Sequence, residues 1–467
     1  ENPEEEENMK KLLCGLLCLV LALSALASVA MAETATGSVR ILANVTGGKD
    51  EEEMTLWAQA LSEATGLDVT VEKPASDYNN VLMQKLSANE SYDLIYLGAS
   101  QYLNLAEQGA LTDLTDYIAN SEILSNNVPA SEWEDLKIDG RIYAGFNKRE
   151  LHVLVNLNKV MLEKAGVNYQ EIEPTLDGYY DVFKKLREAN PSEDFYPLNT
   201  IMSENWDLQP WMASVGLKGG VVVDETDGKT YVPYATDAAA PVWDWFKKLY
   251  DEKLLDPASF VDKTKDMRNK MGAASQQTAV DVDWAAWVGL HNANAAAGGV
   301  DVAGYEIVSL PGCKTPDGSY MLRKGGASLF AVPINATNVE GAVKVLEYFA
   351  TQEGGVLLSL GIKDHDYTVD ANGNYALTEI GASHAMDHGA PVPIDKDFVN
   401  PIGLNLGVEE ALTYLDYASI ERIIPNEGDY KSIVGKWAIS IIKGEVSTLD
   451  GLASMRSELV SMGICEK

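Results

Sequence analysis

The sequence predicts an α/β fold of two halves that share one interface, each half a mostly parallel sheet covered by helices. Strands and helices alternate in β-α-β-α-β order over residues 39–97, and the alternation resumes beyond residue 150. No low-complexity linker and no repeat of short period separates the two regions. Because sheets of this kind bind ligands at the carboxyl ends of their strands, the loops there are the first candidates for a site.

The first half opens with an apolar strand over residues 39–43, which runs into a turn-rich loop containing Asn44 and Thr46. A helix is expected next, because apolar side chains recur at helical spacing from Met54 to Leu61 and the pattern stops at Gly66. The remaining elements of this half are a strand over 68–72, a helix over 81–87 and a buried strand over 93–97.

The second half repeats this alternation. Its predicted elements are a strand over 151–155, helices over 159–165 and 178–189, and strands over 196–200 and 278–283. Two runs rich in Asp, Asn and Gly, residues 224–229 and 370–374, predict the tips of β-hairpins. Neither run has the ligand order of a wrapped Ca²⁺ loop, so a turn is favoured over a calcium site.

A targeting segment precedes the expected fold. Met9 is followed by two lysines, an apolar run over 12–26 and an A-x-A motif that ends at Ala32, as in a secretory signal. We therefore expect a signal peptide over residues 9–32, with Met9 as the start of translation. The expected mature protein is exported.

The four cysteines do not form a disulfide scaffold. Cys14 and Cys18 lie within the expected signal, and neither follows the small residue that a lipoprotein cleavage box needs. Whether Cys313 and Cys465 pair cannot be read from their spacing, and two unpaired thiols are the favoured interpretation. Since no later stretch contains about 18 consecutive apolar residues, the mature protein is expected to be soluble, without a lipid anchor.

Charge and missing motifs exclude several functions. With 70 acidic and 36 basic residues, the chain carries a net charge of −34, which repels phosphate backbones, so no nucleic-acid partner is expected. The nucleophile elbow, the H-E-x-x-H zinc helix, the phosphate loop and the dinucleotide fingerprint are all absent. We therefore predict no catalytic residue and no cofactor. An exported glycan-active enzyme stays an alternative, because the two carboxylates of a glycosidase need no fixed spacing.

Three histidines lie close together in sequence. His365, His384 and His388 have Asp366 and Asp387 beside them, and imidazole with carboxylate is a combination that holds divalent metals. No hydrophobic periodicity indicates a helix there, so polar surface residues in a loop-rich stretch are the favoured interpretation, and no metal site is predicted.

Four tryptophans stand beside polar or turn-forming residues instead of in long apolar runs. A planar indole packs well against the C–H face of a sugar ring while neighbouring amides and carboxylates bind its hydroxyls. Core packing is the competing interpretation for each ring. The pair that directly follows the strand over 278–283 is the more favoured for a site. The four candidates are Trp206, Trp211, Trp284 and Trp287.

Several segments, in their order along the chain, resemble the family 1 extracellular solute-binding proteins of ABC importers, the group that includes maltose-binding protein. The similarity covers most of the chain beyond the signal. It is carried by Asp93-Leu94-Ile95 with residues 105–114, by the strand-like run 138–144, by Val155-Asn156, by Lys164-Ala165-Gly166 with Pro174-Thr175, by residues 249–257, and by Tyr367-Thr368-Val369-Asp370.

This resemblance implies a bilobal, periplasmic-binding-protein-like type II fold whose chain crosses the hinge more than once. The first lobe would comprise residues 38–150 and 305–350, and the second lobe residues 151–304 and 351–467. A monomeric receptor would bind a carbohydrate, with an oligosaccharide as the expected ligand, between its lobes. Lobe closure would then create the surface that the membrane permease recognises.

The resemblance also implies ligand contacts. Trp284 is the expected stacking ring and Asp283 a partner for sugar hydroxyls. Polar contacts are expected after the first and third strands and before the hinge, where Arg149 has a surface ion pair as its alternative role. These residues are Asn44, Thr46, Ser100, Gln101, Asn147 and Arg149.

Two points keep alternatives open. Close relatives often carry a calcium loop where this chain has residues 190–198, and the shortened ligand spacing there means that calcium is not expected. The same receptor architecture also serves peptides, amino acid derivatives and polyamines, and a cleft rich in carboxylates would favour such a cationic cargo.

Overall fold

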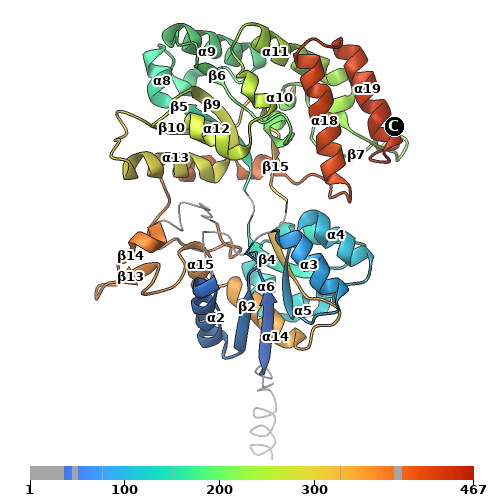
Figure 1. Cartoon of the computed structure of the whole chain (residues 1–467), viewed down its shortest axis with the longest axis vertical. Helices are drawn as coiled ribbons and strands as arrows, with labels where there is room; N and C mark the ends of the chain where they lie inside the picture. Colours follow the sequence, from blue (N-terminus) through green and yellow to red (C-terminus); the bar gives the residue numbers. More distant parts are fainter. Residues whose placement is uncertain (1–35, 45–50, 76, 150, 327, 383–391) are drawn as a thin grey trace, which may run out of the picture. The chain divides into compact units, whose positions relative to one another are not determined.

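The computed structural model describes residues 36–44, 51–75, 77–149, 151–326, 328–382 and 392–467. The chain divides into two compact units, Glu1–Gly37 and Ser38–Lys467, and every helix and strand named below belongs to the second. Within that second unit, Figure 1 shows two α/β lobes, each built on its own sheet. The expected signal peptide over 9–32, together with Thr46, His384 and His388, lies outside the described residues.

The sheet of the first lobe has five strands in the order β2-β1-β3-β12-β4. β1 pairs in parallel with β2 and β3, whereas β12 runs antiparallel to both β3 and β4. β12 enters this sheet from much later in the chain, so the lobe is discontinuous in sequence. The strands are β1 (Ser38–Leu42), β2 (Asp68–Glu72), β3 (Leu94–Gly98), β4 (Ala144–Lys148) and β12 (Ser328–Ala331).

Helices cover this sheet. The predicted apolar positions of α2 are buried, and α2 packs against α14, which also contacts β1 and β4. The helices of this lobe are α2 (Glu51–Thr65), α3 (Tyr78–Ser87), α4 (Ala99–Glu107), α5 (Thr115–Asn120), α6 (Glu122–Asn127), α7 (Ala130–Leu136) and α14 (Val339–Phe349). Helix α15 (Gln352–Ser359) packs on α14 and, with the hairpin β13 (Tyr367–Val369) and β14 (Tyr375–Leu377), forms a small apolar cluster.

The sheet of the second lobe has the order β10-β5-β9-β6. β5 is antiparallel to both of its neighbours, and only β6 and β9 pair in parallel. The prediction of a mostly parallel sheet is therefore wrong for this lobe. The reason is that β9 and β10 return to β5 from distant segments and do not follow it through a strand-helix-strand crossover. The strands are β5 (Val153–Asn158), β6 (Tyr196–Leu198), β9 (Thr278–Trp284) and β10 (Ile307–Leu310).

Two apolar clusters lie on opposite faces of this second sheet. The larger includes Val155, Val280 and Val282 with side chains of α9, α11, α18 and α19, and the smaller joins Leu154 to α13 and α17. The helices are α8 (Lys159–Lys164), α9 (Leu176–Ala189), α10 (Gln209–Met212), α11 (Ala240–Asp251), α12 (Thr264–Met271), α13 (Ala285–Ala297), α17 (Val408–Leu412), α18 (Glu427–Ile442) and α19 (Thr448–Ser461).

Both predicted hairpin tips are confirmed. Residues 224–229 join β7 (Val222–Val223) to β8 (Thr230–Tyr231), and residues 370–374 join β13 to β14. The two cysteines of the described region are unpaired, as the favoured interpretation had it, and burial raises the pKa of both thiols, Cys313 and Cys465.

The connections between the lobes lie side by side. His152, just before β5, forms an antiparallel bridge with Lys324, and the Gly325 amide donates to the Leu151 carbonyl at 2.9 Å. A third segment joins them, because the Lys324 amide donates to the Ser419 carbonyl. This arrangement agrees with the expectation that the chain crosses between the lobes more than once.

The pairing differs in detail from the predicted lobe limits. β10 lies beside β5 in the second sheet, although residues 305–350 were expected in the first lobe. Its inward side chains, Ile307 and Val308, are buried there, so the apolar pattern of β10 is satisfied by the second core. Helix α15, expected in the second lobe, instead contacts α14 of the first.

Candidate functional site

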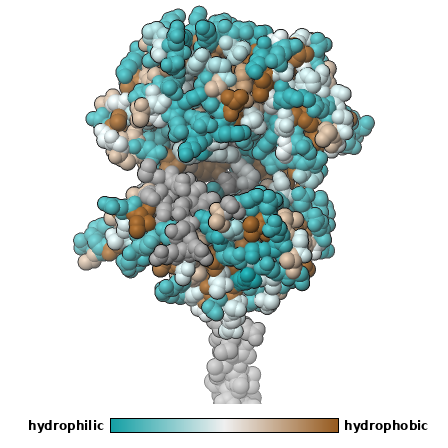
Figure 2. Space-filling view, in the orientation of Figure 1, coloured by the Kyte–Doolittle hydropathy of each residue, from teal (hydrophilic) through white to brown (hydrophobic). Residues whose placement is uncertain are grey.

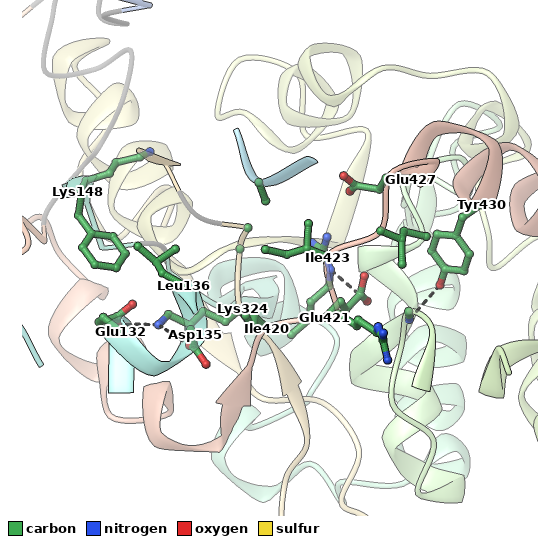
Figure 3. A pocket seen from close by; sticks show the side chains of 18 residues that line it. Glu132, Asp135, Leu136, Lys148, Lys324, Ile420, Glu421, Ile423, Glu427 and Tyr430 are labelled. Carbon is green, nitrogen blue, oxygen red and sulfur yellow. Dashed lines mark hydrogen bonds and ion pairs between the residues drawn. The ribbon is translucent and has the colours of Figure 1, made fainter. Parts of the chain in front are cut away.

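A pocket lies between the two lobes. Its walls come from α4, α7 and β4 of the first lobe, from α18 and residues 420–424 of the second, and from the connecting residues 323–326. It contains about 790 Å³ of empty space, including the part that opens to solvent. Figure 2 shows the surface hollowed between the lobes, and Figure 3 shows the side chains that line the pocket.

On the second-lobe side, the ion pair between Arg323 and Glu421 packs closely against Gly220. Arg323 Nε lies 3.1 Å from Glu421 Oε1, and both side chains are largely buried. Gly220 has a φ of +79°, and a Cβ there would lie only 3.0 Å from the Cβ of Glu421. The backbone amide of Gly220 donates to the Tyr430 hydroxyl at 3.0 Å (Figure 3). Glycine at this position therefore lets Glu421 and Tyr430 approach the chain closely.

On the hinge side, Lys324 connects two acidic residues of α7. Its Nζ lies 2.6 Å from Glu132 Oε1 and 3.9 Å from Asp135 Oδ2. Arg149 Nε approaches the same Glu132 oxygen at 3.5 Å, so the Glu132 carboxylate has two cations as neighbours. Burial raises the pKa of Asp135, although Lys324 opposes that shift. Arg149 was expected either to contact the ligand or to form a surface ion pair. The structure shows an ion pair with Glu132, and this pair is partly buried.

One hydrogen bond joins the two lobes across the pocket. The Ser100 hydroxyl, at the start of α4, donates to Glu427 Oε2 at 2.8 Å, and Lys431 Nζ lies 2.8 Å from the other oxygen of that carboxylate. Burial of Glu427 favours its neutral form, but Lys431 and Ser100 together hold its pKa below the ordinary value. Glu427 therefore stays ionised at neutral pH and acts as an acceptor for a first-lobe hydroxyl.

The charges that line the pocket balance. Four lining side chains are acidic, namely Glu132, Asp135, Glu421 and Glu427, and four are basic, namely Lys148, Arg323, Lys324 and Arg422. The ion pairs of Lys324 and Arg323 already join cations to anions within the set. The pocket therefore carries no net formal charge, and its charged side chains stand among apolar ones such as Leu136, Phe146 and Ile420.

The two favoured tryptophans lie at the end of β9 and the start of α13, both half-buried. The Trp284 ring packs against the larger core of the second lobe and has the Arg323 guanidinium 5.7 Å from its centroid. The Trp287 ring has the Arg268 guanidinium 3.7 Å from its centroid and the His291 ring at 5.5 Å. Trp284 therefore does not line the pocket, but it neighbours Arg323, which does.

Two predicted contacts are unavailable to a ligand in the cleft. Trp211 is fully buried in an aromatic cluster with Tyr179, Phe183 and Trp245, so its ring fills the core, and the site assignment is corrected. Asp283 is also fully buried, and both of its oxygens accept from Arg268, at 2.6 and 2.8 Å. This carboxylate serves an internal ion pair, so its assignment to sugar hydroxyls is corrected as well.

The other predicted residues have local partners or lie beside the pocket. Gln101 Oε1 accepts from the Gly98 amide and caps α4, and Asn147 Nδ2 donates to Ser328 Oγ between neighbouring strands. Asn44 is half-buried at the end of β1. Thr46 lies outside the described residues, and for Trp206 only the backbone is described, in a short 3₁₀ helix.

None of the nine predicted residues whose side chains are described lines the pocket itself, although Ser100, Arg149 and Trp284 each touch a residue that does. Sequence reasoning missed the runs 323–326 and 420–427. A weak signal existed, since Glu421 and Arg422 interrupt an isoleucine run that has neither helical nor strand periodicity. Long-range folding brings both runs to the pocket.

Two α/β lobes joined by adjacent crossings, with a pocket between them, define the class of two-lobed solute-binding proteins. The chain belongs to the family of bacterial extracellular solute-binding proteins, whose model matches residues 48–356. Comparison with curated protein sequences gives no match. Within the described ranges, no helix is both long and apolar enough to cross a membrane.

Solved structures share this fold at low sequence identity. A solute-binding protein of an ABC transporter from Thermotoga lettingae, bound to α-D-tagatose, has a TM-score of 0.66 and 16% identity, covering 92% of this chain and 99% of that one. The GacH receptor of Streptomyces glaucescens, solved unliganded and with acarbose, has a TM-score of 0.64 and 16% identity, covering 91% and 98%. Maltose-bound MalE3 of T. maritima has a TM-score of 0.65 and 15% identity, covering 91% and 100%. The expected fold class is confirmed.

Proposed function

We propose that this protein is the exported receptor of an ABC importer and that it binds an oligosaccharide between its lobes. The observation that carries the proposal is a pocket with walls from both lobes and no net formal charge. A neutral, hydroxyl-rich ligand matches such a lining, because paired charges offer hydrogen bonds to hydroxyls without demanding a charged partner.

Charge balance also separates this ligand class from its rival. A polyamine or a cationic peptide derivative needs an excess of carboxylates in the cleft. The pocket is lined by equal numbers of acidic and basic side chains. Glu421 and Glu132 already have cationic partners within 3.1 Å. A cationic ligand would have to displace these pairs, at a cost of a few kcal/mol for each carboxylate left with a poorer partner.

Stacking supports the carbohydrate assignment. Trp284 is half-buried, stands at the carboxyl end of β9 and approaches Arg323 of the pocket lining. A ligand that extends past Arg323 would meet the exposed part of this indole, so a chain of two or more sugar units fits better than a single ring. Of the relatives, two are bound to acarbose and maltose, which have this size, and one is bound to the monosaccharide α-D-tagatose.

The mechanism needs binding and closure, and no chemical step. The ligand contacts both lobes, and the two adjacent connections at His152 and Lys324 act as the hinge about which they close. The closed form presents a joined surface from both lobes to the permease. We place residues 38–148 and 328–359 in the first lobe and residues 153–323 and 408–467 in the second, with export directed by residues 9–32 and the receptor acting as a monomer.

A thermal-shift screen tests this function. Neutral oligosaccharides should raise the melting temperature in a concentration-dependent way, whereas polyamines and amino acids should not. Chromatography of the same samples after prolonged incubation should recover the sugar intact. Release of shorter products by trace protein would instead favour the glycan-active enzyme, and a shift with polyamines alone would favour the cationic cargo.

A further inference from the structure

A buried row of polar side chains crosses the sheet of the second lobe. Ser309 on β10, Asn156 on β5 and Asp281 on β9 are direct cross-strand neighbours. Ser309 Oγ donates to Asn156 Oδ1 at 2.7 Å, and Asn156 Nδ2 donates to Asp281 Oδ1 at 3.0 Å. This row fixes the Asp281 carboxylate with one oxygen bonded to the sheet and the other, Oδ2, directed toward α13.

That second oxygen meets a histidine. His291 Nε2 of α13 lies 3.7 Å from Asp281 Oδ2, which is too long for a hydrogen bond, and neither atom has a hydrogen-bond partner among the described residues. Asp281 is 0% exposed and His291 is 3% exposed. An unpaired carboxylate oxygen and an unpaired imidazole nitrogen, both buried and facing each other, are costly unless something lies between them.

Asp283 completes the group. Asp281 and Asp283 are two residues apart on β9 and therefore face the same side of the sheet. One ligand atom from each of Asp281, Asp283 and His291 lies within 4.8 Å of the others. Ligand atoms that surround one transition-metal ion at about 2.0–2.2 Å stand roughly 3–3.5 Å apart, so 3.7 Å between His291 and Asp281 needs little adjustment.

The surrounding charges favour a cationic occupant. Arg268 pairs with Asp283, and Asp207 lies close enough that Asp283 and Asp281 add to the burial that raises its pKa. With Asp207 neutral, Arg268 offsets the carboxylate of Asp283 and leaves the formal negative charge of Asp281 for a cation to balance. Without a cation, the buried cluster holds an excess of negative charge.

We propose that Asp281, Asp283 and His291 form a buried site for a divalent transition-metal ion. Zn²⁺ is the ion used to test the site. One imidazole nitrogen and carboxylate oxygens suit Zn²⁺, whereas Mg²⁺ and Ca²⁺ prefer oxygen alone. Asn156 and Ser309 orient the Asp281 ligand from behind. Because the His291 ring packs 5.5 Å from that of Trp287, the ion also steadies the first two turns of α13, which carry Trp287.

Metal titration of the full chain tests the site. Protein without an affinity tag, stripped with a chelator, should bind one equivalent of Zn²⁺ that depends on His291, and Zn²⁺ should raise its melting temperature by about 5 °C. His291→Gln and Asp281→Asn should each abolish this rise. His365→Gln is the matched control, because His365 stands beside Glu53 and Asp366 in a separate His–carboxylate group, and its response should equal that of the wild type.

X-ray absorption on zinc-loaded wild-type protein keeps the test independent of folding in the variants. The proposed site requires a first shell of nitrogen and oxygen at about 2.0–2.1 Å with a single imidazole. Two or more imidazoles, no stoichiometric zinc, or binding that survives both His291→Gln and Asp281→Asn would overturn the proposal.

Discussion

The hydroxyl of Ser100 donates a hydrogen bond of 2.8 Å to the carboxylate of Glu427, joining the first turn of α4 in one lobe to the first turn of α18 in the other. Lys431 holds the second carboxylate oxygen, so Glu427 is ionised and oriented before Ser100 meets it. Charge-assisted hydrogen bonds of this kind are stronger than neutral ones.

Ser100→Ala should therefore favour the open arrangement of the lobes. Loss of a charge-assisted hydrogen bond is worth about 1.5 kcal/mol, which corresponds to roughly tenfold weaker ligand binding. Calorimetry with an oligosaccharide found in the thermal-shift screen measures the change. Ser461→Ala, at an exposed residue whose hydroxyl donates to the Glu458 carbonyl within α19, is the matched control and should leave affinity unchanged. Equal affinities for Ser100→Ala and wild type would mean that this contact does not contribute to closure.

Trp284→Ala should weaken oligosaccharide binding at least tenfold while the fold is retained. The ring stands beside Arg323 of the pocket lining and loses its stacking face on truncation, worth about 1.5 kcal/mol. Trp437→Ala is the comparison, because Trp437 is also half-buried but lies on α18 with its indole bonded to Glu458 and its ring near Lys436. If both variants bind like the wild type, Trp284 has no part in the site.

Asp283→Ala should lower the free energy of unfolding by about 3 kcal/mol, because it leaves Arg268 without its bidentate partner in a buried setting. Chemical denaturation measures this difference. Asp237→Ala provides the contrast, since the Asp237 pair with Arg456 is exposed and should contribute less than about 1 kcal/mol. Similar losses in the two variants would show that burial does not set the strength of the Asp283 pair.

His152 should make the protein sensitive to acid. Burial lowers the pKa of His152 from its ordinary 6.5 to about 4, and its Nε2 lies 3.0 Å from the Ala411 carbonyl oxygen. Between these two pH values the unfolded chain binds a proton that the folded chain does not, so stability falls as pH drops from about 6.5 to about 4. Above pH 6.5 the group contributes no pH dependence.

Urea denaturation at pH 7.5 and pH 4.5 measures the effect. Wild type should lose about 2 to 3 kcal/mol more than His152→Gln over this interval, because the variant lacks the titrating group. Parallel losses in wild type and variant would place the His152 pKa near its ordinary value in the folded protein.

Local sequence patterns predicted the helices and strands, but they did not predict which distant strands pair. The apolar spacing of Met54, Trp57 and Leu61 predicts α2, and the turn residues at 224–229 predict the β7–β8 hairpin, because both patterns depend on near neighbours in sequence. Nothing local indicates that β12 inserts between β3 and β4, or that β10 and β9 flank β5 in antiparallel order. Those pairings depend on where the chain crosses the hinge.

The sequence predicted a binding site between two lobes, but it did not predict which residues line that site. Polar context alone did not separate Trp211, which lies in the aromatic core, from Trp284, which is half-buried beside Arg323, since both have polar neighbours in sequence. Similarly, Asp283 follows the pattern of a strand-end carboxylate, but the partner that removes it from the cleft, Arg268, comes from a different element, α12. The pocket residues of 323–326 and 420–427 meet only in three dimensions.

Solution scattering with and without a saturating oligosaccharide tests the account most directly, because the receptor function depends on closure about the hinge. The radius of gyration of the wild-type protein should fall when the sugar binds, and Ser100→Ala should require more sugar for the same change. Sugar binding with an unchanged radius of gyration, or no binding across the oligosaccharide library, would contradict a receptor that closes on a carbohydrate.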